Sequence, residues 1–412
     1  MNLDIQRKID RILGSGICRL LSLFYYISRD VTPDIKPKRI LVILLSEMGS
    51  LVLARPMFDY LKERYPHASL FVLLFERNVE FLEVLDLVPS ENIFTVNGNS
   101  FSGLFRDSIH VLREIRRSRI DSVIDCELFS RISSIYSFLS GAGIRAGFHP
   151  HTQEGLFRGD FINRPVLYNP YHHISYQFIT LAKAIESDLV PTVKDQIVDG
   201  TFQIPRIKLK QGEVMEWEGR FRSDFPHISA KKLVLLYPGG GLLPIRAWPL
   251  KNFCLVAEDF IQKGYTVCII GTEEDKRLAK EILTHCRSKY CVDLTGYTRT
   301  VRELIVLFHF ASLLITNDGG PGHFASMTPI PCIIFYGPET PVLYRPLDEK
   351  VVNLYKSISC SPCLTAYNHR NSPCDGDNLC LKKISFKEVL IKAYEILEKK
   401  EESQFSDVIR DH

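Results

Sequence analysis

The strongest constraint on the fold is a repeated alternation of short apolar runs with longer helical patterns. One series of runs begins with a β-branched and leucine-rich segment at residues 39–45 and reaches 144–148. A second series begins at residues 232–237 and reaches 332–336. Continuous apolar runs that alternate with helices predict parallel strands buried on both faces. The sequence therefore predicts an α/β fold with two Rossmann-like domains facing a cleft.

The length fits this division, because 412 residues suffice for two or three domains. Residues 150–230 lack the strand–helix rhythm and separate the two series. The predicted parts are an amphipathic N-terminal helix at 1–36, an N-terminal Rossmann-like domain at 37–205, a C-terminal Rossmann-like domain at 206–385 and a last helix at 386–412.

Charge and hydropathy exclude several classes of protein. The 51 basic and 48 acidic side chains leave a net charge of +3, so the whole-chain charge predicts no nucleic-acid partner. No run of about 18 apolar residues predicts a membrane-spanning helix. The charged residues from Asp4 to Arg11 do not fit a signal peptide. Most of the scattered cysteines lie in apolar runs, which suits a reducing, cytoplasmic compartment.

Residues 5–28 have the pattern of an amphipathic helix. The apolar side chains on or near one face are Ile9, Ile12, Leu13, Leu20 and Leu21. One interpretation is an interfacial helix that makes peripheral contact with the cytoplasmic face of the inner membrane. The other is a helix packed on its own domain. Both stay open, because an extension before the first strand has no obvious place in the core.

Small residues follow the ends of several predicted strands, where ligands bind in open α/β sheets. The loop at 45–50 contains Gly49, but it is neither a dinucleotide fingerprint nor a Walker loop. Taken alone it indicates a strand-to-helix turn. After the strand at 232–237 come Gly239, Gly240 and Gly241, with Arg246 before the next helix. This combination predicts an anion site, favouring a diphosphate, over a flexible turn with a surface arginine.

A third loop follows another predicted strand and has the same character. Gly319 and Gly320 let backbone N–H groups converge on an anion, and Asp318 can accept a hydrogen bond or cap a helix. His323 follows in the first turn of a short helix. A lone histidine there would be structural, but the two phosphate-like loops together favour a binding role.

Three segments of the chain together resemble glycosyltransferase family 9, the heptosyltransferase family of lipopolysaccharide core assembly. They are "RILVILLSEMGSLVLARPMFDYLKERYP", "YPGGGLLPIRAWPLKNF" and "NDGGPGHFASMTPIPCIIFYGPETP". The resemblance spans roughly residues 38–395 and implies the two-domain GT-B architecture. It implies a nucleotide-sugar donor on the C-terminal domain, an acceptor on the N-terminal domain and a final helix that crosses back to the N-terminal domain.

The resemblance also implies roles for single residues. Asp318, Gly320 and His323 match the donor-binding D-x-G-x-x-H pattern of the family. Arg246 stands where the family has a phosphate-contacting lysine before a Trp-Pro pair. Arg131 follows Asp125 by six residues and matches a basic residue on the acceptor side.

The general base is the point at which the chain departs from the family. The family usually has an aspartate directly after the glycine of the first loop, and here that residue is Ser50. A serine is too weak a base to deprotonate a sugar hydroxyl unaided. Glu47 is the nearest carboxylate, and Asp125 and Glu127 are further candidates. We take Glu47, Ser50 and Asp125 as catalytic candidates, and as acceptor-binding candidates Gly49, Glu127 and Arg131.

The resemblance implies an inverting glycosyltransferase that needs no catalytic metal or other cofactor. The acceptor would be a cell-envelope glycan or glycolipid such as lipopolysaccharide core, and Arg246, the loop N–H groups and His323 would neutralise the leaving diphosphate. Because Ser50 replaces the usual aspartate, a non-catalytic nucleotide-sugar-binding protein is one alternative. A sugar-nucleotide epimerase, which can share the architecture, is another.

Four cysteines, with the spacing C-x₂-C-x₁₀-C-x₅-C, cluster near the end of the chain: Cys360, Cys363, Cys374 and Cys380. Four thiolates can hold structural zinc, with His369 as a spare ligand. Reduced thiols or a disulfide are the alternatives. None of these roles is catalytic.

Overall fold

A computed structural model divides the chain into two compact units: Met1–Phe202 with Ala366–His369, and Gln203–Thr365 with Arg370–His412. The predicted boundary followed residue 205. The structure describes residues 8–28, 36–45, 48–98, 101–128, 130–149, 157–187, 202, 204–228, 232–241, 243–365 and 372–410, the last ten without their side chains. Each unit is considered by itself below.

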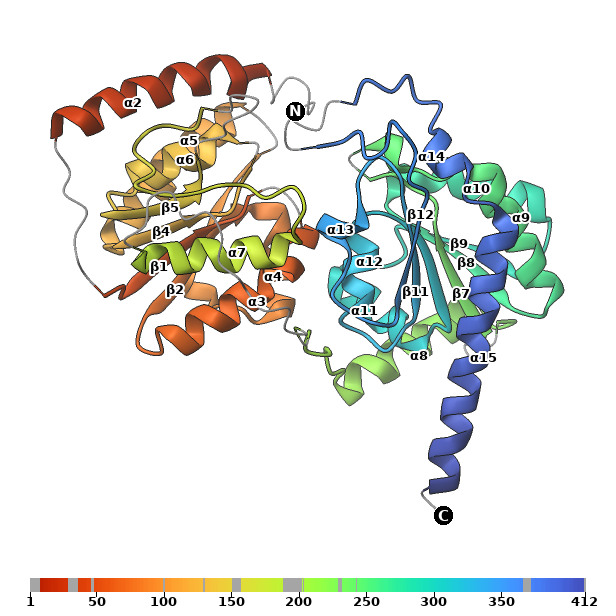
Figure 1. The fold of residues 1–412 in the computed structure, drawn as a ribbon. Coiled ribbons are helices and arrows are strands. Elements are labelled where there is room, and N and C mark those ends of the chain that lie inside the picture. The colour runs from red at the N-terminus through yellow and green to blue at the C-terminus, as the bar shows by residue number, and fades with distance from the viewer. Residues whose placement is uncertain are drawn as a thin grey trace. The chain divides into compact units, whose positions relative to one another are not determined.

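In its described residues the first unit contains a parallel sheet of six strands in the order β3-β2-β1-β4-β5-β6. This is the strand order of a dinucleotide-binding Rossmann domain. The strands are β1 (Arg39–Ile43), β2 (Ser69–Phe75), β3 (Ile93–Val96), β4 (Ser122–Asp125), β5 (Ile144–Phe148) and β6 (Arg164–Val166). The helices that follow these strands are α3 (Met48–Arg64), α4 (Val79–Leu85), α5 (Phe101–Arg117), α6 (Arg131–Leu139) and α7 (Ile174–Lys183) (Figure 1).

The described part of the second unit repeats this plan, with a parallel sheet in the order β12-β11-β10-β7-β8-β9. Its strands are β7 (Leu233–Tyr237), β8 (Thr266–Gly271), β9 (Cys291–Thr295), β10 (Leu313–Asn317), β11 (Cys332–Tyr336) and β12 (Val351–Tyr355). Its helices are α8 (Gln211–Asp224), α9 (Leu250–Gln262), α10 (Lys276–Cys286), α11 (Val301–Phe310), α12 (Gly320–Ala325), α13 (Pro341–Tyr344), α14 (Leu379–Lys382) and α15 (Phe386–Arg410).

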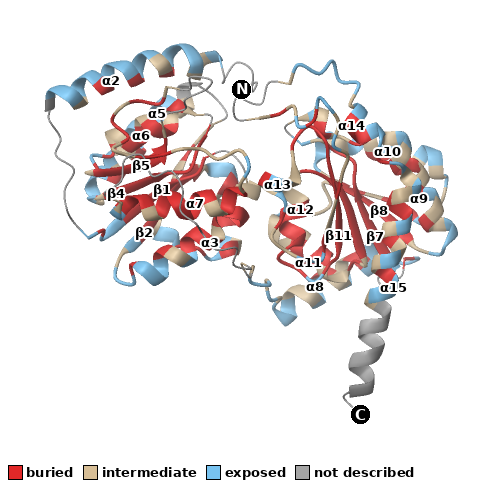
Figure 2. Cartoon of the chain, viewed as in Figure 1, coloured by how far each residue is buried: buried red, intermediate tan, exposed pale blue. Residues whose placement is uncertain are grey.

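The apolar runs of the sequence form the middle of both sheets. Every residue of β7, β10 and β11 is buried, as continuous apolar strands require when helices cover both faces (Figure 2). In the first unit β1 is buried from its second residue on. The predicted pair of Rossmann-like domains is thereby confirmed.

Two edge strands and helix α8 are among the elements that escaped the sequence pattern. The edge strand β6 is only three residues long and contains Pro165, which weakens a strand signal. The edge strand β12 is half-buried, so its apolar run is interrupted. Helix α8 has a mostly polar sequence in which Trp217 and Phe221 are the buried residues. Each element lies at a sheet edge or outside a sheet, where burial constrains the sequence least.

An N-terminal helix precedes the first strand, as predicted. It opens with a π-helical turn at Asp10–Gly14 and continues as α2 (Ser15–Ser28). Cys18 and the partly buried Leu21 and Tyr25 pack on Phe161 of the first unit. For the side of the helix that carries Cys18, Leu21 and Tyr25, the interpretation of a helix packed on its own domain is therefore correct. No helix in the described residues is long and apolar enough to cross a bilayer.

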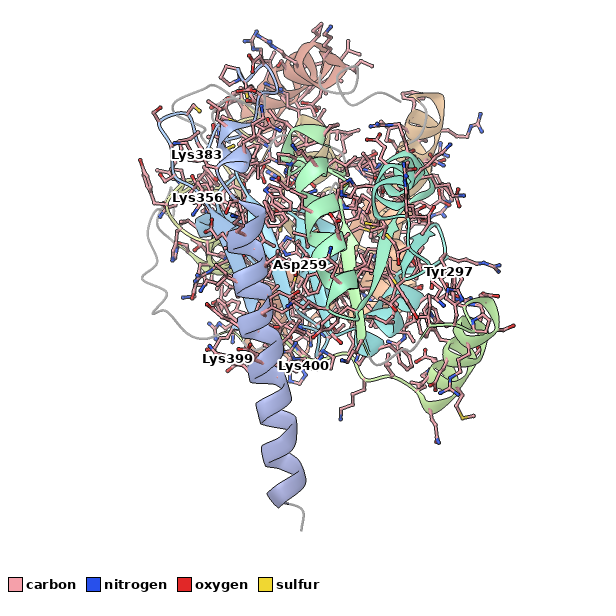
Figure 3. The ribbon with its side chains drawn as sticks, turned by 90° about the vertical axis from the view of Figure 1, so that its right-hand side faces the viewer. Asp259, Tyr297, Lys356, Lys383, Lys399 and Lys400 are labelled. Atoms are coloured by element: carbon pink, nitrogen blue, oxygen red, sulfur yellow. The ribbon has the colours of Figure 1, made fainter. Side chains whose placement is uncertain are left out.

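The last helix, α15, packs on the second unit through the residues whose side chains are described. Its buried residues Val389, Leu390, Ala393 and Leu397 belong to the core of that unit. The hydroxyl of Tyr394 donates to Asp259 on α9, and Lys400 lies beside Ala311 and Ser312 (Figure 3). The predicted crossing of this helix to the N-terminal domain stays a prediction.

Trp248 joins the start of α9 to the segment before α15. Its ring packs edge-on against Phe253, and its indole N–H donates to the carbonyl oxygen of Ile384 at 3.0 Å. The other tryptophan, Trp217, is also buried, but its indole N–H has no hydrogen-bond partner among the described residues. The two tryptophans therefore allow a matched comparison: both rings are buried, and they differ in whether the indole N–H has a hydrogen-bond partner among the described residues.

We expect Trp248→Phe to lower the free energy of unfolding by about 1–2 kcal/mol more than Trp217→Phe does. Both variants lose the same ring volume, but only the first removes a hydrogen bond from a buried carbonyl. Chemical denaturation followed by circular dichroism measures the difference. Equal losses would show that the indole contact with Ile384 adds no stability.

Candidate functional site

The two neighbouring strands at the centre of the first sheet end in residues that the sequence singled out. β1 and β4 pair in parallel, so their carboxyl ends lie at the same edge. Glu127, after β4, accepts a hydrogen bond from the backbone N–H of Leu45, after β1, at 2.7 Å. Gly49 and Ser50 lie half-buried in the first turn of α3. Glu47, the nearest carboxylate in that loop, falls outside the described residues.

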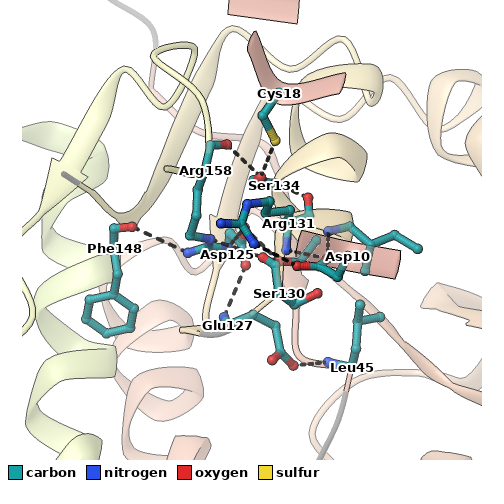
Figure 4. Close-up of polar contacts among 12 residues, drawn as sticks. Asp10, Cys18, Leu45, Asp125, Glu127, Ser130, Arg131, Ser134, Phe148 and Arg158 are labelled. Carbon is teal, nitrogen blue, oxygen red and sulfur yellow. Dashed lines mark hydrogen bonds and ion pairs between the residues drawn. The ribbon is translucent and has the colours of Figure 1, made fainter. Parts of the chain in front are cut away.

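Asp125, at the end of β4, forms a buried ion pair with Arg158 (Figure 4). The two residues are 0% and 1% exposed. The carboxylate of Asp125 also accepts hydrogen bonds from the hydroxyl of Ser133 and the backbone N–H of Glu127, both at 3.1 Å. Arg158 in turn donates to the carbonyl oxygen of Ser130 at 3.1 Å. The pair therefore joins β4, the start of α6 and the segment around residue 158.

Burial raises the pKa of the Asp125 carboxyl, while the charge of Arg158 and the hydrogen bonds from Glu127 and Ser133 oppose that rise. A raised pKa suits a general base. Geometry argues the other way, because a carboxyl with no exposed surface cannot take a proton directly from a bound sugar hydroxyl. Arg158 was not predicted, since nothing in the irregular sequence around it distinguishes a structural arginine.

Arg131, predicted on the acceptor side, contacts the N-terminal helix. Its guanidinium lies 3.2 Å from the carboxylate of Asp10 and donates to the carbonyl oxygen of Phe157 at 3.0 Å. The same carboxylate accepts from the backbone N–H groups of Arg131 and Ile132, at 2.8 and 3.2 Å. Asp10 therefore caps α6 in place of Ser130, whose side chain makes no cap.

In the second unit the two predicted glycine-rich loops lie together. The side-chain amide of Asn317 donates to the carbonyl oxygens of Pro238 and Gly239, at 3.0 and 2.9 Å. Its oxygen accepts from the backbone N–H of Trp248 at 2.8 Å. Asn317 is buried and was missed as a site residue, although it stands directly before Asp318. It holds the loop after β7 against the end of β10.

Glycine is required at two points of the first of these loops. A Cβ on Gly240 would lie 2.8 Å from the Cα of Pro244, and Gly241 has a φ of +58°, where other residues are strained. Gly239 precedes them in the same turn. The loop therefore brings its backbone close to the short 3₁₀ turn Pro244–Arg246.

Arg246 is buried between two carboxylates. Its guanidinium lies 2.9 Å from an oxygen of Glu339 and 3.6 Å from an oxygen of Asp318. Arg246 and Asp318, both singled out in the sequence as donor-binding candidates, thus lie side by side, and Glu339 joins them. Glu339 follows β11 as Asp318 follows β10, and the two strands are parallel neighbours. The rule that site residues follow strand ends would have found it.

The remaining residues of this segment lie at the start of α12. Gly319 is the N-cap residue, Gly320 begins the helix, and His323 is buried within it. The hydroxyl of Ser326 donates to the carbonyl oxygen of His323 at 2.6 Å. The second unit thus gathers Arg246, Asp318 and the glycine loops near one edge of its sheet.

Structural zinc, one interpretation of the four-cysteine loop, stays a prediction. The described residues contain no group of three or more His, Cys, Asp or Glu side chains placed to hold a metal ion. Cys360 and Cys374 are exposed, while Cys380 is buried. The thiol of Cys363 accepts a hydrogen bond from Ser372 at 3.1 Å. Burial raises the pKa of the Cys380 thiol, and the neighbouring thiols of Cys363 and Cys360 add to that rise.

Comparison with known proteins gives a consistent family. A family model described as glycosyltransferase family 9 (heptosyltransferase) matches residues 109–372. The lipooligosaccharide heptosyltransferase 2 of Haemophilus ducreyi is 23% identical, with 76% of this chain and 87% of the relative covered. The lipopolysaccharide heptosyltransferase 2 of Salmonella typhimurium is 25% identical, covering 76% and 86%.

Solved structures support the same fold. An E. coli ADP-heptose lipopolysaccharide heptosyltransferase II has a TM-score of 0.68 at 20% identity, covering 88% of this chain and 99% of that one. A family 9 glycosyl transferase from Veillonella parvula has a TM-score of 0.67 at 21% identity, covering 89% and 99%. Because the family model matches more than half of the chain, this protein belongs to glycosyltransferase family 9 and is a glycosyltransferase.

Proposed function

We propose that this chain transfers a heptose from ADP-heptose to the core region of a lipopolysaccharide, with inversion at the anomeric carbon and without a catalytic metal. Relatives named as lipopolysaccharide heptosyltransferases support the sugar and the acceptor. The name of the E. coli ADP-heptose enzyme supports the donor. The observation that carries the proposal is Arg246, held at the glycine loop by Asp318 and Glu339.

The donor diphosphate is proposed to bind at Arg246 and the loop after β7. A guanidinium offers paired donors to phosphate oxygens, and glycines let the backbone N–H groups approach them. Asp318 and Glu339 keep the guanidinium in place and can accept hydrogen bonds from sugar hydroxyls. As the bond to the diphosphate breaks, Arg246, the loop and His323 stabilise its growing charge, so the proposal requires no metal.

Glu47 is proposed as the general base. It lies in the loop between β1 and α3, three residues before the position where the family usually has an aspartate. Ser50 is too weak a base, and Asp125 is fully buried in its ion pair with Arg158. A carboxylate at Glu47 would take the acceptor hydroxyl proton while that oxygen attacks the anomeric carbon. Gly49, Glu127 and Arg131 would then border the acceptor.

The proposed place of the reaction is the cytoplasmic face of the inner membrane, with peripheral contact through α2. A lipopolysaccharide core under construction is a glycolipid, so its sugar groups stand close to a bilayer surface. The net charge of +3 gives no reason to propose a nucleic-acid partner.

The donor assignment predicts a selective gain in thermal stability. Among ADP-, UDP-, GDP- and CMP-linked sugars, ADP-heptose should raise the melting temperature most, because a ligand that binds only the folded state stabilises it. Arg246→Lys keeps the charge and should weaken donor affinity less than tenfold. Arg246→Gln removes it and should weaken affinity roughly 10- to 100-fold.

The control for this series is Arg277→Gln, which removes an exposed arginine of the same unit that pairs with Glu281. It should leave the shift unchanged. A flat response of the wild-type protein to all four donors would contradict the donor site.

The base assignment predicts that Glu47→Gln lowers kcat by roughly 10²- to 10⁴-fold with little change in donor affinity. Ser50→Ala should lower it less than tenfold. Adding Ser50→Asp to Glu47→Gln should restore part of the rate, because it places a carboxylate where the family usually has its aspartate. The first turn of α3 also favours a negative charge through the helix dipole. The measurement is ADP release with and without acceptor.

The same assay separates the other two functions. ADP-heptose binding with no transfer by the wild-type protein would favour the non-catalytic binding protein. Conversion of the donor in the absence of acceptor would favour the epimerase. Unchanged turnover of Glu47→Gln would remove Glu47 from the role of base.

The buried ion pair predicts a stability defect and not a catalytic one. Asp125→Asn leaves the charge of Arg158 buried without its partner, which should lower the free energy of unfolding by about 3–5 kcal/mol. Among folded molecules kcat should fall less than tenfold. Arg64→Met, which breaks the exposed pair with Glu186 in the same unit, should cost about 0–1 kcal/mol. A loss of kcat above 100-fold in folded Asp125→Asn would make Asp125 the base.

A further inference from the structure

The N-terminal helix over residues 8–28 has its amphipathic faces reversed relative to an ordinary surface helix. Small and polar residues at four-residue intervals face the first unit: Asp10, Gly14, Cys18 and Ser22. The thiol of Cys18 lies 3.7 Å from the hydroxyl of Ser134, and the hydroxyl of Ser22 accepts from the backbone N–H of Asp160 at 2.9 Å. A Cβ on Gly14 would lie 3.0 Å from Arg131. This face fits closely because its side chains are short.

The opposite face consists of large apolar side chains in solvent. Eight of them are 42–72% exposed, namely Ile12, Leu13, Ile17, Leu20, Leu23, Phe24, Tyr26 and Ile27. A helix that only covered its own domain would turn such residues inward. Figure 2 shows the outer side of α2 as exposed along its length. An apolar surface of this extent indicates a site for an apolar partner.

The charges of the helix select among apolar partners. Its exposed charged residues in the described range are Lys8, Arg11 and Arg19, all cations. Its one described acid, Asp10, is turned inward to Arg131. Two copies of this helix would bring six cations together, whereas a bilayer with anionic headgroups complements them. A basic helix with a continuous apolar face is the pattern of an interfacial helix, which lies in the membrane plane.

We propose that residues 8–28 dock in the surface of an anionic lipid bilayer and that Asp10 transmits this docking to the acceptor side of the site. Asp10 touches Arg131 and caps α6, so a docked helix fixes the start of α6 at the end of β4. This second part rests on the proposed function, in which Arg131 borders the acceptor. Asp10 is a positioning residue, since it acts through Arg131.

Vesicle flotation with the full chain tests docking without any assay of activity. Wild-type protein should float with phosphatidylglycerol–phosphatidylcholine vesicles and bind pure phosphatidylcholine at least tenfold more weakly. Leu20→Ser with Leu23→Ser and Ile27→Ser should lower binding more than tenfold. Arg11→Gln and Arg19→Gln should each lower anionic binding roughly fivefold. Ile391→Ser, a 59% exposed apolar residue on α15, is the matched control and should change nothing.

Two results would overturn docking. One is equal flotation of the triple serine variant and the wild type. The other is a stable dimer in solution that the triple variant abolishes, since that would make a second copy the occupant of the face.

The role of Asp10 is tested with a soluble, deacylated core oligosaccharide and with the same acceptor on vesicles. Asp10→Asn should float like the wild type, raise the acceptor KM at least tenfold on both acceptors and leave the donor KM unchanged. The triple serine variant should lose turnover only on vesicles. An unchanged acceptor KM in Asp10→Asn would overturn the coupling. Absence of turnover in the wild type with both acceptors would refute the proposed function, while flotation would still decide docking.

Discussion

The buried pair of Asp125 and Arg158 determines how the first unit is built. Two opposite charges with almost no exposed surface are tolerable only when each finds several partners. Asp125 supplies this through Ser133 and the N–H of Glu127, and Arg158 through the carbonyl oxygen of Ser130. All of these partners follow β4 or begin α6. The electrostatic requirement of one pair therefore fixes the path of the chain where β4 ends.

In the second unit a neutral side chain, Asn317, fixes the path of the chain at the strand ends. Asn317 joins its two loops by donating to two carbonyl oxygens and accepting one N–H, at no cost of charge burial. Buried charges lie beside it, where Arg246 faces the carboxylates of Asp318 and Glu339. In the proposed donor site, an arginine held in this way would be fixed in orientation before the diphosphate binds, which would reduce the entropy lost on binding. The first unit thus buries a charge pair for structure, whereas the buried charges of the second unit lie where the donor is proposed to bind.

These differences explain what the sequence could predict. The strand–helix rhythm was sufficient for both sheets, because burial on two faces demands continuous apolar runs such as β7 and β10. Arg246 and Asp318 were singled out because they stand next to glycine loops, and the structure places them side by side. Arg158 was not, because a buried arginine is recognised only by a partner that lies 33 residues away in the chain.

The N-terminal helix shows that two interpretations of one pattern can both be partly correct. Its inner face packs on the first unit, as the first interpretation requires, and its outer face keeps the apolar residues that motivated the other. One carboxylate links the two, because Asp10 both caps α6 and neutralises Arg131. If Arg131 borders the acceptor as proposed, a docked helix that holds Asp10 in place also holds the Arg131 guanidinium in the orientation in which it meets the acceptor. Coupling between binding events is reciprocal. Docking of the helix on the bilayer must then change the acceptor affinity by the same factor by which acceptor binding changes the affinity of the helix for the bilayer.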